Sequence, residues 1–168
     1  MPGLGKVPER IRLALHQLDP KPGEQILEIG CGPGVAAALV ADRIGSSGHL
    51  VAIDRSATAL ARARARTADR SDRITFVRTD LAGFTADRTF DKAFCVNVNV
   101  FWTAPADPEL TVLRNCLRPG GTVYICYESP KGRRPSERVV KRVIKVLARN
   151  GFLVSARSKP LLTFAGSL

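Results

Sequence analysis

Three glycines fall at every second position directly after a short apolar run. The run is residues 26–29, and the glycines are Gly30, Gly32 and Gly34. Glycine suits tight turns and close backbone approach, because a Cβ atom would occupy the space that a ligand needs. The Ala-rich residues 35–44 have a helical pattern, so the glycines lie at the start of a helix. Nucleotide-type ligands bind at such strand-to-helix junctions in open α/β sheets.

Three successive apolar runs each end in a carboxylate. Glu28 belongs to the first run, Asp54 ends the second and lies twenty residues after Gly34, and Asp80 ends the third. The carboxyl ends of parallel strands meet at one edge of a sheet, so we expect the three acids to gather there. At this edge Asp54 can accept hydrogen bonds from both hydroxyls of a ribose. The acidic cluster stands out against the formal net charge of +11.

These motifs resemble the class I S-adenosylmethionine-dependent methyltransferases over residues 23–168. The resemblance rests on the glycine loop at 28–34, Asp54, Asp80, the strand at 90–97 and the turn at 117–121. It implies a Rossmann-like fold that binds S-adenosylmethionine and releases S-adenosylhomocysteine. It also implies that Asp54 binds the ribose and that Asp80 lies near the adenine amino group. The cofactor-binding residues expected on this basis are Glu28, Gly30, Cys31, Gly32, Gly34, Asp54, Arg55, Asp80, Leu81 and Asn97.

Strand-like and helical segments alternate along the chain, which predicts a doubly wound α/β fold. The predicted strands are residues 25–30, 50–54, 74–78, 90–97, 122–127, 152–158 and 161–165. The predicted helices are residues 8–18, 35–44, 57–68, 107–117, where Asp107 is the cap, and 135–150, with a poor helical segment at 81–89. Only two residues separate the last two strands, too few for a parallel crossover. We therefore expect a mostly parallel seven-stranded sheet, with helices on both faces and a C-terminal antiparallel hairpin.

Length and composition favour one globular domain over residues 1–168. The hydrophobic content of 45% and the charged content of 24% are ordinary for a soluble domain. Residues 1–22 form an N-terminal helix and loop that could cover the site. The sequence shows no signal-peptide pattern and no apolar run long enough for a membrane span, so we expect a cytoplasmic protein without a membrane partner. The four cysteines form no Cys-x-x-Cys pair, which argues against a disulfide framework and a metal site.

The methyl acceptor is expected near the end of the strand at 90–97. Phe101 and Trp102 could wall an apolar substrate, although ordinary core packing explains them equally well. Lys131 and Arg133 lie in a basic loop that could hold an anionic group of the substrate. The chain is short, so the pocket is either open or completed by a second subunit, and a homodimer remains an option.

No catalytic base can be assigned from the sequence. His16, Tyr127 and Glu128 are the candidates, and a surface role is the alternative for His16 and Glu128. Many methyl transfers need no strong base when the nucleophile is a thiol, an amine or an ionised phenol.

The sequence is compatible with three functions. A small-molecule methyltransferase is favoured. A nucleic-acid (RNA) methyltransferase is the first alternative, because basic residues cluster at 62–70 and along the last helix. The absence of an Asn-Pro-Pro-Tyr or Asp-Pro-Pro-Tyr motif after residue 96 and the scarcity of aromatic residues count against it. The second alternative is a non-catalytic protein that binds the S-adenosyl nucleoside.

Overall fold

The computed structural model describes residues 7–128, 136–157 and 161–168 of the chain. Its helices are α1 (Glu9–Leu18), α2 (Val35–Ile44), α3 (Ala57–Arg66), the short 3-10 helix η1 (Ala68–Arg70), α4 (Val100–Thr103), α5 (Asp107–Cys116) and α6 (Glu137–Arg149). Its strands are β1 (Gln25–Ile29), β2 (His49–Asp54), β3 (Ile74–Arg78), β4 (Phe90–Val96), β5 (Leu117–Tyr127), β6 (Leu153–Arg157) and β7 (Leu162–Ser167).

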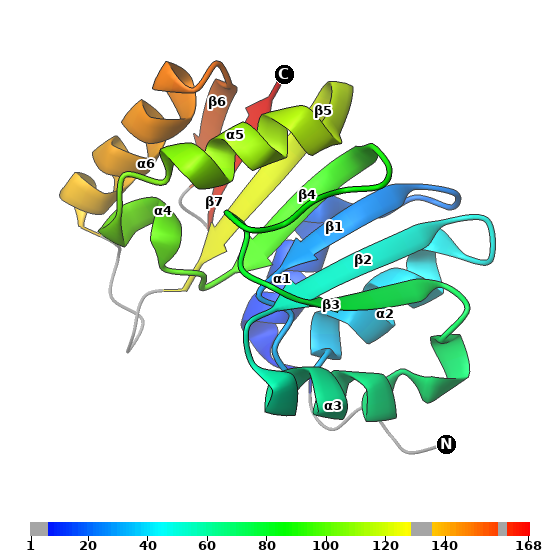
Figure 1. Cartoon of the computed structure of the whole chain (residues 1–168). Coiled ribbons are helices and arrows are strands. Elements are labelled where there is room, and N and C mark those ends of the chain that lie inside the picture. Colours follow the sequence, from blue (N-terminus) through cyan, green and yellow to red (C-terminus); the bar gives the residue numbers. More distant parts are fainter. Residues whose placement is uncertain (1–6, 129–135, 158–160) are drawn as a thin grey trace.

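The strands form one seven-stranded sheet in the order β3-β2-β1-β4-β5-β7-β6 (Figure 1). Neighbouring strands from β3 to β5 are parallel, while β7 is antiparallel to both β5 and β6. The predicted mixed sheet and its closing hairpin are therefore confirmed. The strand order reverses between β1 and β4, and open α/β sheets bind ligands at the carboxyl ends of the strands beside such a switch point.

Two helical layers cover the sheet, α1, α2 and α3 on one face and α4, α5 and α6 on the other (Figure 1). The alternation of side chains along β1 explains how both layers are filled. Ile26 packs with the core under α1 and α2, whereas Leu27 and Ile29 pack with the core under α5 and α6. Because the central strands are buried on both faces, they are almost continuously apolar.

The crossover from β3 to β4 differs from the sequence-based prediction. Residues 81–89, expected to be partly helical, contain turns and no helix. The Asp80 carboxylate accepts a hydrogen bond from the Gly83 amide at 2.8 Å, which closes a local turn instead of continuing a helix. Leu81 and Phe84 are buried, so this segment covers the sheet through two apolar anchors.

The start of α5 also differs from the prediction. Asp107 is the first residue of the helix, and Ala106 precedes it in the left-handed conformation without a side-chain cap. The Asp107 carboxylate instead accepts hydrogen bonds from Arg149 Nε at 3.0 Å and from Asn150 Nδ2 at 2.8 Å. The acid thus joins the start of α5 to the end of α6, and the predicted capping role is wrong.

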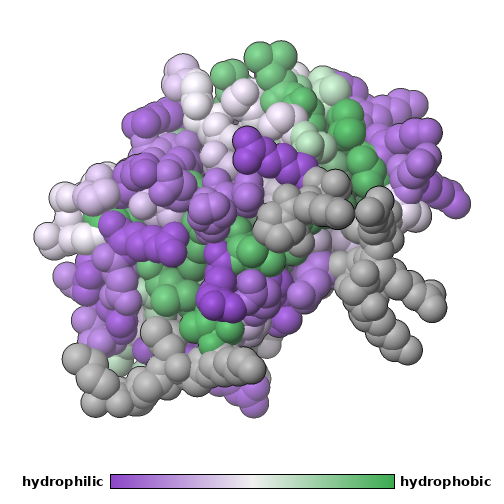
Figure 2. All heavy atoms as spheres, turned by 180° about the vertical axis from the view of Figure 1, so that it is seen from behind, coloured by the Kyte–Doolittle hydropathy of each residue, from purple (hydrophilic) through white to green (hydrophobic). Residues whose placement is uncertain are grey.

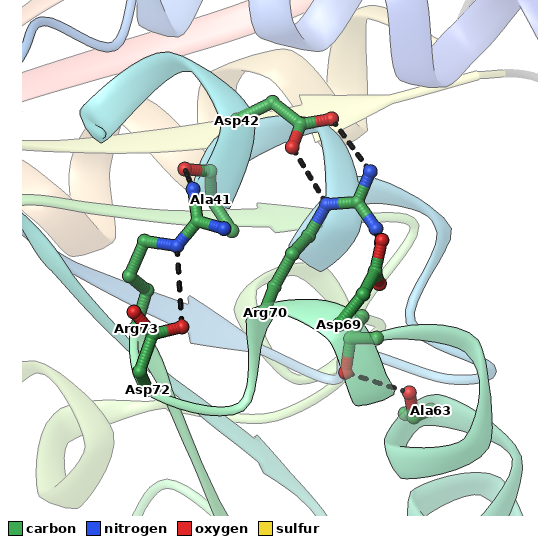
Figure 3. Close-up of polar contacts among 8 residues, drawn as sticks. Ala41, Asp42, Ala63, Asp69, Arg70, Asp72 and Arg73 are labelled. Carbon is green, nitrogen blue, oxygen red and sulfur yellow. Dashed lines mark hydrogen bonds and ion pairs between the residues drawn. The ribbon is translucent and has the colours of Figure 1, made fainter. Parts of the chain in front are cut away.

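A polar network ties the connection between α3 and β3 to α2 (Figure 3). The Arg70 guanidinium contacts the Asp42 carboxylate through Nε at 2.6 Å and Nη2 at 3.0 Å, and it also contacts Asp69. Arg73 donates to the Ala41 carbonyl at 3.3 Å. These contacts hold the layer of helices that follows the glycine loop.

On the side of the molecule turned away from α5, hydrophilic residues cover most of the surface, with smaller hydrophobic patches between them (Figure 2). None of the helices within the described residues combines the length and the apolar character needed to cross a membrane. All four cysteines are buried free thiols.

Candidate functional site

The glycine loop leaves β1 and is held against the end of β2. The amides of Gly30 and Cys31 both donate to the Ile53 carbonyl, at 2.8 and 3.1 Å. Gly30, Gly32 and Gly34 have φ angles of 70°, 53° and 76°, in the left-handed region that favours glycine. Gly34 is the residue that precedes α2. The loop therefore wraps around the helix N-terminus, as the sequence pattern predicted.

The three glycines have different surroundings. A Cβ atom on Gly32 would meet nothing within 4 Å, so this position faces open space. On Gly30 it would lie 2.7 Å from Val98 Cγ2. On Gly34 it would lie 2.8 Å from Ala63 Cβ and 2.9 Å from Ala63 Cα, because α2 and α3 approach closely there. Gly34 is buried and lines neither of the cavities described below.

Asp54 connects the loop to the start of α3. Its Oδ2 atom accepts a hydrogen bond from the Gly32 amide at 2.9 Å, and Oδ1 accepts one from the Ser56 amide at 2.8 Å. Ser56 in turn caps α3 by accepting from the Ala59 amide. The carboxylate is half-buried, so it is fixed in place and still reaches the cavity at the carboxyl edge of the sheet.

Glu28 lies in β1 beneath the loop and is only 4% exposed. Its Oε2 atom is buried without a hydrogen-bond partner among the described residues. Burial, with a smaller contribution from the Asp54 charge, raises the pKa of the Glu28 carboxyl to about 8. An unpaired buried carboxyl oxygen is costly, and such a group marks a place where a ligand can complete the structure.

A cavity of about 500 Å³ lies above β1, β2 and β3. It brings together six of the predicted cofactor residues, namely Gly30, Asp54, Arg55, Asp80, Leu81 and Asn97. The sequence did not predict the opposite wall of this cavity, which includes Asn99, Thr103 and Glu109. The sequence carries only a weak signal for this wall, because the helix α4 that shapes it has four residues, too few to show a helical periodicity.

A second cavity of about 290 Å³ lies between the loop and the N-terminal segment. Glu28, Cys31 and Gly32 line it from below, and Pro8, Arg10 and Ile11 line it from the side of α1. Residues 1–22 were expected to cover the site, and the described part of this segment does border the smaller cavity. Arg10 also lines this cavity, although nothing in the sequence indicated that it would lie there. The two cavities share Gly30 and Asn97, so they meet at the tips of β1 and β4.

Asn97 is held firmly at the point where the cavities meet. Its φ angle is 57°, a conformation that asparagine tolerates better than most residues. Its amide donates to the Cys126 carbonyl at 2.9 Å, and its Oδ1 accepts from the Glu128 amide at 2.7 Å. The ends of β4 and β5 are therefore locked together beside the site.

The candidate catalytic residues lie outside both cavities. His16 is exposed on α1. The Tyr127 ring packs edge-on against Trp102, with 4.5 Å between the ring centroids. The Glu128 carboxylate is exposed and lies 3.4 Å from Arg10 Nη1. None of the three lines either cavity, and their catalytic roles stay a prediction.

The four residues expected at the acceptor site divide into two groups. Phe101 is completely buried in the core, so it offers no surface to a substrate, and Trp102 lines neither cavity. The packing alternative describes both aromatic residues better than the substrate-wall alternative. Lys131 and Arg133 lie outside the described residues.

Comparisons with known proteins agree with this architecture. A family model described as a methyltransferase domain matches residues 26–121. The chain is 29% identical to Methyltransferase GfsG of Streptomyces halstedii over 73% of its own length and 44% of the relative. It is also 29% identical to a protein-L-isoaspartate O-methyltransferase of Methanothermobacter thermautotrophicus, over 68% of this chain and 54% of the relative. The chain thus spans about half the length of these relatives.

A solved structure shares the fold across the whole chain. The S-adenosylmethionine-dependent methyltransferase from Aquifex aeolicus superimposes with a TM-score of 0.77 at 18% identity, over 99% of this chain and 93% of that one. At this identity the likeness concerns the fold alone. The family model covers more than half of the chain and includes the glycine loop, Asp54 and Asp80. The chain therefore belongs to the class I S-adenosylmethionine-dependent methyltransferase family.

Proposed function

We propose that the chain binds S-adenosylmethionine across the two cavities and transfers its methyl group to a small-molecule acceptor. The observation that carries this proposal is that the two cavities share Gly30 and Asn97, and that Glu28, whose Oε2 atom has no partner among the described residues, lines the smaller one. The larger cavity, of about 500 Å³, has an ordinary volume for a small-ligand site, and the smaller one, of about 290 Å³, adjoins it. The proposal assigns the adenosine part to the first and the methionine part to the second.

The residues present fit this cofactor. Glu28 supplies a buried acceptor for an ammonium group, which would satisfy its unpaired oxygen. Asp54 has the position and charge to accept from two ribose hydroxyls. Asp80 and Leu81 line the same cavity, where they would face the adenine. The open space at Gly32 and the absent side chain at Gly30 leave room for close backbone approach.

When bound, the cofactor supplies a sulfonium whose methyl group is already activated for attack. The chain then has to orient the reactants and exclude water, and well-oriented reactions gain roughly 7–11 kcal/mol from positioning. Asn97 and Gly30 line both cavities, so in this proposal they contact the cofactor where its two parts join and help to orient it. The proposed transfer does not require a strong base from any of the described side chains that line the cavities.

Two observations favour a small acceptor. The cavities are compact spaces bordered by α1 and by the segment that includes α4. Three arginines in or just after α3 bind other groups of the chain at its surface: Arg64 donates to the Phe76 carbonyl at 3.1 Å, Arg66 donates to the Pro33 carbonyl at 2.9 Å, and Arg70 binds Asp42. This group therefore has less freedom to bind phosphates than its sequence suggested.

An RNA acceptor is the second candidate, because α6 carries cations on its exposed side. Arg138, Arg142 and Lys145 are exposed and lie opposite the buried Val143 and Leu147. Such a stripe can follow a phosphate backbone. Replacing both Arg142 and Lys145 by Glu should weaken RNA binding and reduce its salt dependence if this candidate is correct.

Transfer of a labelled methyl group distinguishes these functions. The purified protein would be incubated with methyl-labelled S-adenosylmethionine and either the small-molecule fraction or the RNA fraction of a cell extract. Label in the small-molecule fraction supports the first proposal, and label in RNA supports the second. Cofactor binding without transfer to any fraction would contradict catalysis and favour the binding-protein alternative.

A further inference from the structure

The smaller cavity contains a titratable group that binding must affect. Glu28 projects from β1 toward the loop and lines this cavity, and its Oε2 atom has no partner among the described residues. The side chain is 96% buried, since the residue is only 4% exposed. A carboxyl group placed this way has little water to stabilise its charged form.

The neighbouring groups do not compensate for this burial. Asp54, at the end of β2, adds a negative charge nearby, and this charge raises the pKa of Glu28 further. The walls from α2 and β4 provide Val35, Ala36, Val96 and Asn97, none of which carries a charge. The Cys31 thiol also borders the cavity, and burial raises its pKa as well, so it stays neutral and adds no charge of either sign.

Among the described residues that line the smaller cavity, Arg10 alone is positively charged. It comes from α1, and its Nη1 atom lies 3.4 Å from the carboxylate of Glu128. No ion pair between Arg10 and Glu28 is found among the described residues. Glu28 therefore has no cationic partner in the described part of the chain, and its pKa of about 8 leaves it mainly protonated at neutral pH.

We propose that an ammonium group entering the smaller cavity displaces the proton of Glu28 to the solvent. This inference rests on the proposed function, in which the amino-acid end of the cofactor occupies this cavity. The carboxyl O–H bond breaks, the proton goes to the buffer, and the new carboxylate accepts a hydrogen bond from the ammonium. Cofactor capture is thereby coupled to release of one proton.

Two consequences follow for recognition. A ligand that carries the adenosine part without an ammonium group does not stabilise the charged form of Glu28, so Glu28 keeps its proton. A ligand with the ammonium group must also displace the proton, so its affinity rises with pH as long as Glu28 starts out protonated. Well below pH 8, where the ammonium group stays charged, the dissociation constant should fall about tenfold for each unit of pH, and this dependence should level off as the pH approaches 8. The site then favours complete S-adenosyl amino acids most strongly at mildly alkaline pH.

Calorimetry in buffers of different ionisation enthalpy measures this proton directly. S-adenosylhomocysteine would be titrated into the protein at pH 6.5 in phosphate and in imidazole, and the difference in heat gives the number of protons released. We expect close to one proton for the wild type and close to none for Glu28→Gln, which keeps the shape of the neutral side chain. We also expect none for 5′-methylthioadenosine, which lacks the amino-acid end.

The outcomes separate this inference from the proposed function. Binding of S-adenosylhomocysteine without proton release, or equal release with 5′-methylthioadenosine, overturns the coupling and leaves the cofactor assignment intact. Proton release that persists in Glu28→Gln assigns the proton to another group and likewise overturns it. If S-adenosylhomocysteine does not bind to the folded wild type at pH 6.5 or pH 8, both proposals fail. A tenfold tighter dissociation constant at pH 7 than at pH 6, lost in Glu28→Gln, supports the inference.

Discussion

Asp54 has two roles that one carboxylate can serve together. It accepts hydrogen bonds from the Gly32 and Ser56 amides, and it lines the larger cavity where the ribose is proposed to bind. Hydrogen bonds to a charged group contribute about 1.5–3 kcal/mol each. Asp54→Ala should therefore weaken binding of S-adenosylhomocysteine roughly tenfold to several hundredfold, as measured by calorimetry.

The matched control for this variant is Asp72→Ala. Asp72 is an exposed acid that contacts Arg73 beside η1, away from both cavities. We expect the control to bind S-adenosylhomocysteine as the wild type does. An unchanged affinity in Asp54→Ala, with the fold intact by circular dichroism, would show that the ribose assignment is wrong.

Gly32 is the glycine at which cofactor contact can be tested with the least disturbance of packing. A side chain there would meet no other atom within 4 Å, although its φ angle of 53° strains any L-residue by about 1–2 kcal/mol. Gly32→Val should keep the fold and lose cofactor binding, because its branched side chain enters the smaller cavity. Calorimetry and circular dichroism together check both parts, and tight binding by the folded variant would contradict the proposed site.

At the scale of elements, Gly34 joins α2 to α3. A methyl group at this position would lie 2.8 Å from Ala63 Cβ and 2.9 Å from Ala63 Cα, so the two helices would have to separate. Gly34→Ala should lower the midpoint of thermal unfolding by several degrees, since left-handed strain alone contributes about 1–2 kcal/mol. Differential scanning calorimetry measures this shift.

Gly120→Ala is the control, because Gly120 has a similar φ of 77° but no atom within 4 Å of its Cβ position. Equal shifts in the two variants would contradict the packing role.

The sequence predicted those elements whose signals are local. Three such signals are the glycine loop between strand and helix, the acid at the end of β2 and the short connection between the last two predicted strands. Each depends on residues close in the sequence, and the observed sheet confirms the predicted mixed arrangement of strands. The sequence could not show that Gly32 faces open space while Gly34 packs against Ala63, because a regular spacing of glycines does not indicate which residues lie next to each of them. Asp107 looked like a helix cap, but its partners Arg149 and Asn150 lie more than forty residues away. Phe101 likewise needed the tertiary structure to identify it as a core residue.

For the molecule as a whole, the same buried acid that is proposed to meet the cofactor also affects stability. The edge of the sheet gathers Glu28 and Asp54 within a strongly basic chain, and the burial that shapes the smaller cavity makes the charged form of Glu28 unfavourable. In the folded protein without cofactor, Glu28 therefore keeps a proton at neutral pH that it would release in the unfolded chain. Ligand binding and folding stability are thus linked to one titration.

This linkage predicts how stability depends on pH. The pKa of Glu28 is raised from 4.5 in the unfolded chain to about 8 in the folded protein, so the folded protein holds the proton more tightly. Its contribution to the free energy of unfolding is present below pH 4.5 and is lost as the pH rises through about 8, by at most roughly 5 kcal/mol. Glu28→Gln cannot titrate, so its unfolding midpoint should rise relative to the wild type between pH 5 and pH 8. Calorimetric scans of both proteins without ligand test this, and a constant difference between them across that range would show that Glu28 keeps an ordinary pKa in the folded protein.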